Sequence, residues 1–287
     1  MKTLIIGAKG MLGNELSKVF AKYNPTLWSR DDIDISDKEQ VDKKIGELAP
    51  ELIINAAAYT AVDKCEENEE IATKVNGEAV GYLAKIAKKL GSTLVHYSTD
   101  YVFDGTKKEG YVESDTPSPA SAYGRSKLQG EKQILKQVQD DGSEFKYYII
   151  RTAWLFGPEG KNFVETMLFL AHQGKEIKVV DDQFGSPTYA PDLAKATLEI
   201  VENKKPSGIY HRTNDGQCSW YQFAKEIFKV FDKKVDLSSC SAEEYPMPAK
   251  RPEYSVLIST KLPVMRSWKS ALEDYKISCH SDRNESL

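Results

Sequence analysis

The chain has 287 residues, of which 40% are hydrophobic and 29% charged, and its formal net charge is −4 at pH 7. A chain of this length can bury a substantial core, whereas no apolar run reaches the length of a membrane span and no basic cluster offers a nucleic-acid surface. We therefore expect neither nucleic acid nor a membrane as a partner. The four cysteines and four histidines lack the close spacing of a zinc site or a disulfide framework. The N-terminus runs into a glycine turn and not into a secretory signal, which predicts a cytoplasmic protein.

The first predicted element is a short strand over residues 3–6, followed by a glycine-rich turn and a helix. Residues 7–13 read Gly-Ala-Lys-Gly-Met-Leu-Gly, and apolar side chains then recur at helical spacing as far as Phe20. In such a turn the glycines permit the bend, the approach of a pyrophosphate and close helix packing, while the helix N-terminus faces the phosphates. The pattern favours a dinucleotide over a plain turn. The cofactor-binding residues predicted here are Gly7, Gly10, Met11, Leu12 and Gly13.

A second strand is predicted over residues 26–29, and it leads into a charged segment. An arginine at this position accommodates the 2′-phosphate of NADPH, whereas a carboxylate binds the ribose hydroxyls of NADH. Arg30 therefore favours NADPH, and the aspartates at 31–32 leave NADH open. We expect Asp34 and Ile35 beside the adenine.

The third strand, over residues 52–55, follows a helix predicted at 38–48. It is apolar on both faces, as a parallel sheet requires. Ala56, Ala57 and Ala58 come directly after it. Small side chains at the carboxyl end of a strand allow a flat cofactor to lie against the backbone, although tight helix packing would also explain them. A long helix is predicted next, over residues 66–90.

A fourth strand, over residues 93–97, ends in Ser98, Thr99 and Asp100. Hydroxyl groups at this position can donate hydrogen bonds to a carbonyl oxygen on which negative charge develops. These residue types are also common in turns and helix caps, so a purely structural role is the alternative.

Tyr123 and Lys127 lie four residues apart in a helix predicted over residues 123–138, with Ser121 as its N-cap. Positions i and i+4 share one face of a helix, which predicts a phenol and an ammonium side by side. A neighbouring cation lowers the pKa of a tyrosine, normally about 10, and suits it to proton transfer near neutral pH. The same spacing also occurs by chance, so the pair alone does not establish a catalytic site.

Beyond a fifth strand, predicted over residues 146–151, the alternation of strands and helices becomes less regular. Further elements are predicted as a helix ending near residue 171, a strand at 177–180, helices at 192–203 and 219–231, and a strand at 208–211. The sequence thus predicts an α/β protein with a doubly wound, Rossmann-type parallel sheet and a smaller C-terminal α/β substrate domain. We place the NAD(P)-binding domain at 1–155, with about 190–211 returning to it, and the substrate domain at 156–189 and 212–287. The polar tail from residue 278 is expected to be loose.

The glycine turn, the Ser-Thr-Asp tip and the Tyr/Lys pair together resemble the extended short-chain dehydrogenases/reductases. Motifs along nearly the whole chain are more specifically similar to the dTDP-4-dehydrorhamnose reductase family. These motifs are HYSTDYVFDG at 96–105, RTAW at 151–154, NF at 162–163, DQFGSPT at 182–188 and RPEYS at 251–255.

This resemblance implies NADPH-dependent reduction of the C4 keto group of dTDP-4-dehydro-L-rhamnose to dTDP-L-rhamnose, with NADH as a possible second cofactor. It implies that Tyr123 protonates the alkoxide, that Lys127 lowers the tyrosine pKa and holds the nicotinamide ribose, and that Ser98 or Thr99 binds the carbonyl oxygen. The other substrate contacts that it implies are Asp100 and Trp154 around the sugar, and Asn162 and Arg251 at the diphosphate.

Some family members are thought to dimerise through Mg²⁺ held by carboxylates. Glu15 and Asp192 occupy the relevant regions here, but Pro191 precedes the second and cannot be a ligand, so a metal bridge is doubtful and either a monomer or a homodimer is expected. A dehydratase of this fold would carry a glutamate where Tyr101 stands. A related epimerase/reductase, or a noncatalytic regulatory subunit that resembles the reductase, remains the alternative.

Overall fold

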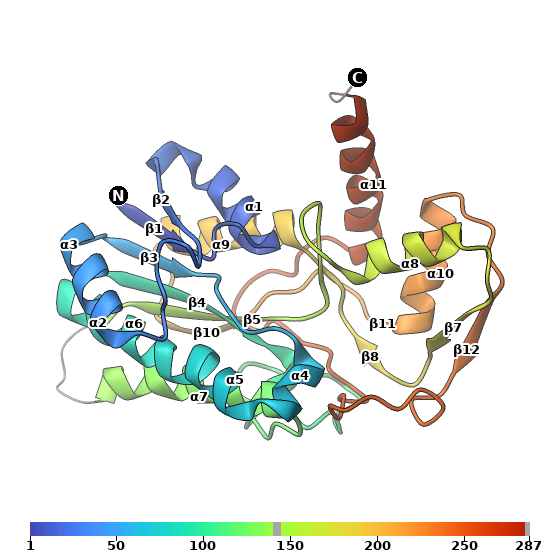
Figure 1. Ribbon diagram of the computed structural model, residues 1–287, viewed down its shortest axis with the longest axis horizontal. Helices are drawn as coiled ribbons and strands as arrows, with labels where there is room; N and C mark the ends of the chain where they lie inside the picture. The colour runs from blue at the N-terminus through green and yellow to red at the C-terminus, as the bar shows by residue number, and fades with distance from the viewer. Residues whose placement is uncertain (140–144, 285–287) are drawn as a thin grey trace.

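A parallel sheet of six strands forms the centre of the larger part of the molecule, in the order β10-β5-β4-β3-β1-β2 (Figure 1). The computed structural model describes residues 1–139 and 145–284. The strands of this sheet are β1 (Thr3–Ile6), β2 (Thr26–Trp28), β3 (Leu52–Asn55), β4 (Thr93–Thr99), β5 (Tyr147–Thr152) and β10 (Gly208–His211). All neighbouring pairs are parallel. The predicted doubly wound α/β fold is therefore confirmed.

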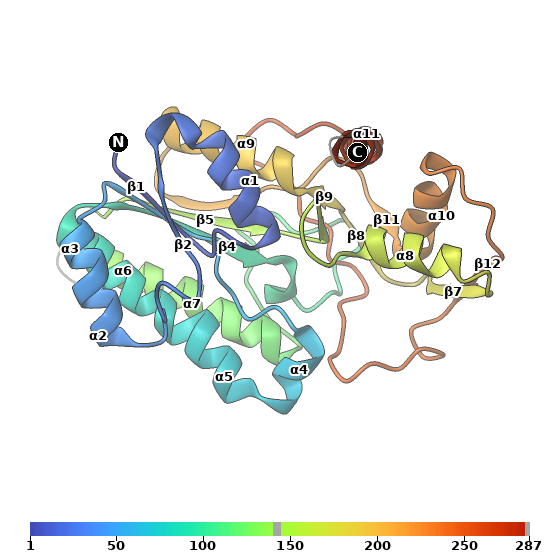
Figure 2. The same ribbon diagram turned by 45° about the horizontal axis from the view of Figure 1, so that its top comes forward.

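Helices cover both faces of this sheet (Figures 1 and 2). On one face lie α1 (Met11–Val19) and α9 (Ala190–Glu202), and on the other lie α6 (Ala79–Leu90) and α7 (Ala122–Gln139). Shorter segments complete this part: η1 (Ala21–Tyr23), α2 (Lys38–Gln40), η2 (Val41–Ile45), α3 (Gly46–Leu48), α4 (Val62–Glu67), α5 (Glu69–Thr73), η3 (Lys74–Glu78) and η4 (Asp100–Val102).

The helix predicted over residues 66–90 is in fact interrupted. Helix α4 ends at Glu67, because the φ of −136° at Asn68 is not helical, and η3 is a π-helical turn. This turn buries the Asn76 side chain, which bonds the Tyr59 backbone and, at 3.0 Å, the Ser126 hydroxyl on α7. Through Asn76, the π-helical turn thus connects the loop after β3 to α7, the helix that carries Tyr123.

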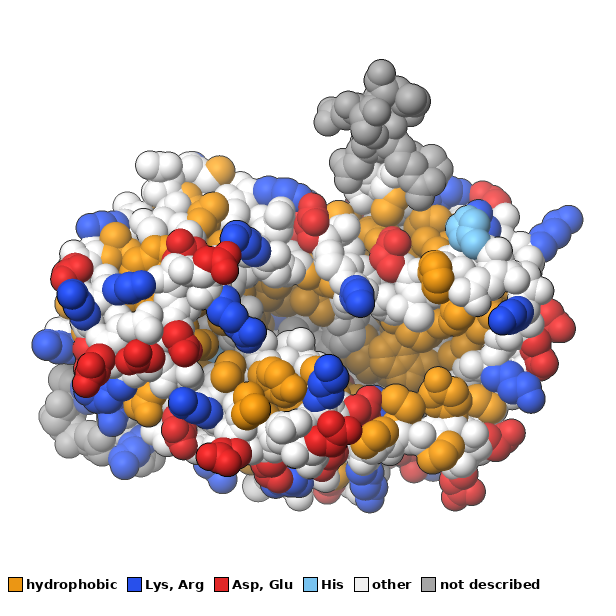
Figure 3. Space-filling view, in the orientation of Figure 1, with side chains coloured by type: hydrophobic (Ala, Val, Ile, Leu, Met, Phe, Trp, Pro, Cys, Tyr) orange, Lys and Arg blue, Asp and Glu red, His pale blue; other side chains and the backbone are white. Residues whose placement is uncertain are grey.

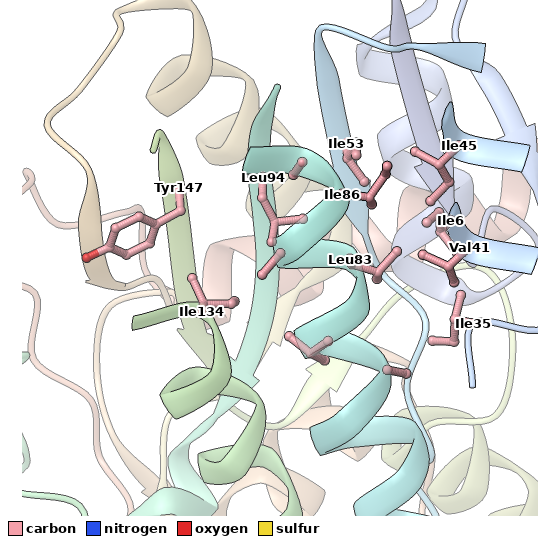
Figure 4. Close-up of a cluster of buried hydrophobic side chains, with 14 of the residues drawn as sticks. Ile6, Ile35, Val41, Ile45, Ile53, Leu83, Ile86, Leu94, Ile134 and Tyr147 are labelled. Carbon is pink, nitrogen blue, oxygen red and sulfur yellow. The ribbon is translucent and has the colours of Figure 1, made fainter. Parts of the chain in front are cut away.

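Two apolar clusters, one on each face, hold the helices to the sheet. Figure 4 shows the cluster under α6, in which Ile53 and Leu94 of the sheet lie with Leu83 and Ile86 of the helix. All four side chains are almost fully buried. Burial of one such side chain stabilises the fold by about 1.5–3 kcal/mol, so these clusters fix the sheet whose strand tips carry the site.

The smaller part consists of three helices and short strand pairs. The helices are α8 (Phe163–His172), α10 (Trp220–Val230) and α11 (Trp268–Asn284). The pairs are β7 (Ile177–Val180) with β12 (Leu237–Cys240), β8 (Phe184–Gly185) with β11 (Cys218–Ser219), and β6 (Leu155–Phe156) with β9 (Thr188–Tyr189).

The expectation of a loose tail from residue 278 is wrong as far as Asn284, because α11 continues to that residue; residues 285–287 lie outside the described part. Leu272 and Tyr275 anchor α11 in the apolar cluster of the smaller part. Strand β10 pairs with β5, which supports the predicted return of 190–211 to the first domain. The domain boundaries themselves stay a prediction.

Candidate active site

The turn between β1 and α1 is so close to neighbouring backbone that it requires glycine. Gly7 has φ +81°, and a Cβ atom there would lie 2.7 Å from the Ala57 backbone nitrogen. A Cβ atom on Gly13 would lie 2.0 Å from the Gly7 carbonyl oxygen. Helix α1 begins after Gly10 without a side-chain cap, so its first N–H groups are available to an anion. The turn therefore fits a pyrophosphate.

A cavity of about 410 Å³ opens beside this turn. The predicted cofactor residues that line it are Gly7, Gly10, Arg30, Asp34, Ile35, Ala56, Ala57 and Ala58. Met11, Leu12 and Gly13 do not line it, and Leu12 packs instead in the core behind the turn. Sequence reasoning missed Lys9, Ser29, Ile33 and Val75, because which side chains of a turn or helix face a cavity depends on tertiary packing.

In the charged segment after β2, the Arg30 side chain and the side chains of Asp31 and Asp32 have different surroundings. Asp31 pairs with Lys9 at 2.6 Å, and Asp32 accepts a hydrogen bond of 2.7 Å from the Ser29 backbone nitrogen. Neither aspartate lines the cavity, whereas Arg30 does. The cavity thus presents the arginine that suits a 2′-phosphate.

The tip of β4 directs Ser98 and Thr99 in opposite directions, because successive side chains of a strand alternate between its faces. The Ser98 hydroxyl donates a hydrogen bond of 2.5 Å to Glu131, which also holds Arg151 in an ion pair of 2.7 Å. The Glu131 and Arg151 side chains are each only 1% exposed. Ser98 therefore belongs to a buried network with Glu131 and Arg151, which favours Thr99 over Ser98 as the donor to a carbonyl oxygen; this assignment stays a prediction.

Thr99 and Asp100 lie next to Tyr123. The Thr99 hydroxyl donates a hydrogen bond of 2.8 Å to Asp100, and it also accepts one from the Tyr101 backbone nitrogen. Burial raises the pKa of Asp100 to about 6, and its Oδ2 atom has no hydrogen-bond partner among the described residues. An unpartnered buried carboxylate oxygen is costly, so this atom is suited to accept a ligand hydroxyl.

Tyr123 stands at the start of α7, where Ser121 caps the helix as predicted. Burial and the nearby Asp100 carboxylate raise the pKa of Tyr123, and only the bond to Thr99 acts in the opposite direction. The Lys127 ammonium donates a hydrogen bond to the Tyr97 carbonyl oxygen at 2.6 Å. That Lys127 lowers the tyrosine pKa stays a prediction.

Lys127 is itself almost completely buried. Burial lowers the pKa of its ammonium to about 8, and the Glu131 carboxylate acts in the opposite direction. His96, 3.4 Å from Nζ, stays neutral because burial lowers its pKa. Lys127 thus changes charge just above neutral pH.

We expect the affinity for a nicotinamide dinucleotide to fall by about fivefold between pH 7 and 9. The Lys127 side chain is mostly a charged ammonium below pH 8 and mostly a neutral amine above it. A hydrogen bond from a charged donor to the cofactor stabilises the complex by about 1 kcal/mol more than one from a neutral donor. Quenching of NADPH fluorescence at a series of pH values measures this affinity. The Lys127→Met variant should bind more weakly and without this pH dependence; an unchanged profile in that variant would assign the titration to another group.

Trp154 follows β5 of the large sheet and contacts α10 of the smaller part. It has φ +46° and stacks on Trp220, with ring centroids 3.5 Å apart. A Cβ atom on Gly185 would lie 2.4 Å from the Trp154 ring, so the glycine is needed for this stack. Figure 3 shows a hollow between the parts, with hydrophobic side chains along it. Trp220 was missed because its partnership with Trp154 is a long-range contact.

Two predicted diphosphate contacts already have partners within the chain. Asn162 caps α8, since its Oδ1 accepts a hydrogen bond from the Glu165 nitrogen and its amide donates to the Gly157 carbonyl oxygen. The Arg251 guanidinium forms a bidentate pair with Asp63, with both distances 2.8 Å. In this structure Asn162 therefore caps α8, and Arg251 links the C-terminal segment to Asp63 of α4.

The two carboxylates considered for a metal are likewise paired with cations. Glu15 accepts a hydrogen bond from Lys18 at 2.7 Å, and Asp192 is held by Arg266 at 2.7 Å and by Asn214 at 2.8 Å. No group of three or more His, Cys, Asp or Glu side chains arranged for a metal occurs in the described ranges. None of the helices in those ranges combines the length and apolar character that a membrane crossing requires.

Comparison with known proteins gives consistent matches. Residues 1–278 match the family model for the RmlD substrate binding domain. A dTDP-4-dehydrorhamnose reductase from Burkholderia thailandensis is 39% identical over 279 residues, which cover 91% of this chain and 92% of that protein.

Two crystal structures extend this similarity to the fold. A dTDP-4-dehydrorhamnose reductase from Bacillus anthracis in complex with NADP has a TM-score of 0.91 at 38% identity and covers 97% of this chain and 100% of that one. A dTDP-4-dehydrorhamnose reductase from Clostridium acetobutylicum has a TM-score of 0.91 at 43% identity and covers 98% and 100%.

Proposed function

The chain belongs to the RmlD substrate binding domain family, and we propose that it uses NADPH to reduce the C4 keto group of dTDP-4-dehydro-L-rhamnose, giving dTDP-L-rhamnose. The observation that carries the proposal is the meeting of Thr99 and Asp100, at the end of β4, with Tyr123 of α7; the neighbouring strand β3 leads into Ala56, Ala57 and Ala58, which line the cavity that fits a dinucleotide. The intact Tyr123 and Lys127 favour an enzyme over a noncatalytic subunit.

Each side chain has a separate task in this reaction. NADPH, when bound, supplies the hydride that reduces C4. On substrate binding the Thr99 hydroxyl turns its proton from Asp100 to the carbonyl oxygen as negative charge develops there, and Tyr123 gives its phenolic proton to that oxygen. Its raised pKa keeps this proton in place until the oxygen becomes basic. Asp100 Oδ2 accepts a hydroxyl of the sugar, Trp154 packs against the ring, and Lys127 holds the nicotinamide ribose.

The proposal is tested by following nicotinamide absorbance with the purified protein. We expect NADPH to be consumed only after dTDP-4-dehydro-L-rhamnose is added, with dTDP-L-rhamnose as the product. Absence of turnover with the authentic substrate, at high enzyme concentration and with both NADPH and NADH, would rule out the proposed activity. Tightly bound oxidised cofactor with no net consumption would favour an epimerase.

Thr99→Ala should lower kcat by about 10²–10³, the usual effect of removing one donor to a developing oxyanion. Ser98→Ala is the matched control, because its hydroxyl faces Glu131; we expect it to change kcat only a few-fold and to cost about 1 kcal/mol of stability. Steady-state kinetics and urea unfolding measure both effects. A larger loss of kcat in Ser98→Ala than in Thr99→Ala would reverse the assignment of the two hydroxyls.

For the choice of cofactor, we propose that Arg30 selects NADPH over NADH. Arg30→Ala should weaken NADPH binding about tenfold and leave NADH nearly unaffected, since only NADPH carries a 2′-phosphate to pair with the guanidinium. Binding titrations with both dinucleotides decide this. An equal loss of affinity for NADPH and NADH in Arg30→Ala would show that Arg30 does not bind the 2′-phosphate.

On metal and assembly, we propose a monomer or homodimer without a Mg²⁺ bridge. The support is that Glu15 and Asp192 each have a cationic partner within the chain. Sedimentation with Mg²⁺ and with a chelator tests this, and a mass that changes with the metal would contradict it.

A further inference from the structure

A second cavity, of about 420 Å³, lies along α9, away from the proposed active site. We call it the α9 groove. One wall is formed by residues of α9 from Asp192 to Ile200 and by Asn203, which caps that helix, and the other by the segment 262–266. Arg212, which directly follows β10, contributes to the lining. It shares no lining residue with the cofactor cavity. Any ligand held there would bind independently of the dinucleotide.

Arg212 is the unusual residue of this groove. It is only 6% exposed, and its one side-chain hydrogen bond among the described residues runs from NH1 to the Pro263 carbonyl oxygen at 2.7 Å. Its Nε is buried and has no partner in the described part of the chain, and no ion pair within 4.0 Å is found for it there. Burial lowers the pKa of Arg212, and the Glu199 and Glu113 carboxylates oppose this shift without forming an ion pair with it. Buried arginines are normally paired directly with an anion, because an unpaired buried charge is costly.

The charge of the groove favours an anionic ligand. Lys195 and Lys205 line it with Arg212, and neither lysine forms an ion pair within the described ranges. Of the acidic lining residues, Asp192 is already held by Arg266, which leaves Glu199 as the remaining carboxylate. Three cations against one carboxylate give an excess of positive charge, although the whole chain is at −4.

The opposite wall adds an apolar surface. Leu262, Pro263, Val264 and Met265 line the groove, and Val264 is 70% exposed. A volume of this size lies within the range of small-molecule sites, which combine apolar walls with a few converging polar groups. Inorganic phosphate alone would leave this apolar wall uncovered.

We propose that the α9 groove binds a small molecule that carries a phosphate group next to an apolar part. Its phosphate is held by the Arg212 guanidinium with Lys195 and Lys205, which suits arginine's preference for phosphate oxygens. Its apolar part lies against Val264 and Met265. This site goes beyond the proposed reductase activity and does not depend on it.

Phenyl phosphate is the probe, and the methyl signals of methionines labelled with ¹³C are the readout. The protein is first saturated with NADP⁺, so that the dinucleotide site is filled. Met265 lines the α9 groove, whereas Met11 begins the helix directly after the glycine turn and lies outside the lining of the groove, so its signal is the control. We expect phenyl phosphate to shift the Met265 signal saturably without moving that of Met11, and benzyl alcohol to produce no saturable shift.

Arg212→Leu should weaken this binding by about tenfold or more, since charge-assisted hydrogen bonds are lost. If that variant does not fold, Lys205→Gln should weaken it several-fold. Lys85→Gln, an exposed lysine on α6 at the opposite face of the sheet, removes the same charge and should have no effect. The proposal fails if Met265 and Met11 shift together, if the Met265 shift does not saturate, or if the folded groove variants bind as tightly as the wild type.

Discussion

Replacing Tyr123 with phenylalanine is expected to lower kcat by about 10²–10⁴ while the protein stays folded, which is the usual range for removing a general acid. The ring would keep its edge-on contact with Tyr101, at 5.6 Å between centroids, so the substitution removes little besides the proton donor. Single-turnover kinetics with NADPH and the keto sugar measure the loss, and circular dichroism confirms the fold.

Tyr97→Phe is the control for this substitution. Its hydroxyl bonds Thr197 on α9 at 2.8 Å, on the side of the sheet opposite α7, and only its backbone carbonyl meets Lys127. We expect a loss of about 1 kcal/mol in stability and a kcat close to that of the wild type. A Tyr123→Phe variant that is as fast as Tyr97→Phe would mean that water or another group donates the proton.

Replacing Arg151 with methionine should lower the free energy of unfolding by about 3–5 kcal/mol, because it leaves the Glu131 carboxylate buried without its cation. Arg151 donates to both Glu131 oxygens, at 2.9 Å and 2.7 Å, and its guanidinium lies 5.0 Å from the centroid of the Phe103 ring. This pair links β5 to α7, one turn beyond Lys127. Urea unfolding at neutral pH measures the cost.

Arg125 supplies a matched comparison on the same helix. It also forms a bidentate pair, with Glu69, at 2.7 Å for each bond, but both side chains are more than 40% exposed. Arg125→Met should therefore cost at most about 1 kcal/mol. The double variant Glu131→Leu with Arg151→Met should recover part of the single loss. Equal costs for the buried and the exposed arginine would show that the buried pair does not stabilise the fold.

Much of the nucleotide-binding half could be predicted because its signals are local. An apolar strand, a glycine turn and a helix lie next to one another in the chain, so the arrangement around Gly7 and Gly13 follows from sequence order. The strand ends at Asn55 and Thr99 were likewise close to the predicted ones, since a parallel strand buried on both faces is a continuous apolar run.

The features that could not be predicted depend on contacts between residues distant in sequence. Ser98 and Thr99 are adjacent in the sequence, but only the folded chain shows that the Ser98 hydroxyl donates to the buried Glu131, which is paired with Arg151. The action of Lys127 on Tyr123 stays a prediction, but the helical spacing could not show that the Lys127 ammonium donates to the Tyr97 carbonyl oxygen of β4. No pattern within the helix contains that information.

The smaller part was harder to predict for the same reason. Strand β12 has few apolar residues and is a strand because it pairs with β7. The part of α11 from residue 278 was expected to be a loose polar tail, and the buried residues that anchor this helix, Leu272 and Tyr275, lie before it. The Trp154 and Trp220 stack joins a loop to the first residue of α10, and Gly185 makes room for it. Such partnerships are visible only in the folded chain.

The most direct test of the central claim is to run the reaction with NADPH that carries deuterium at both hydrogen positions of nicotinamide C4 and to locate the label in the product by NMR. Hydride transfer to the keto carbon predicts one deuterium at C4 of dTDP-L-rhamnose, with the new hydroxyl proton supplied through Tyr123. A product without deuterium, or with deuterium at another carbon, would contradict the account.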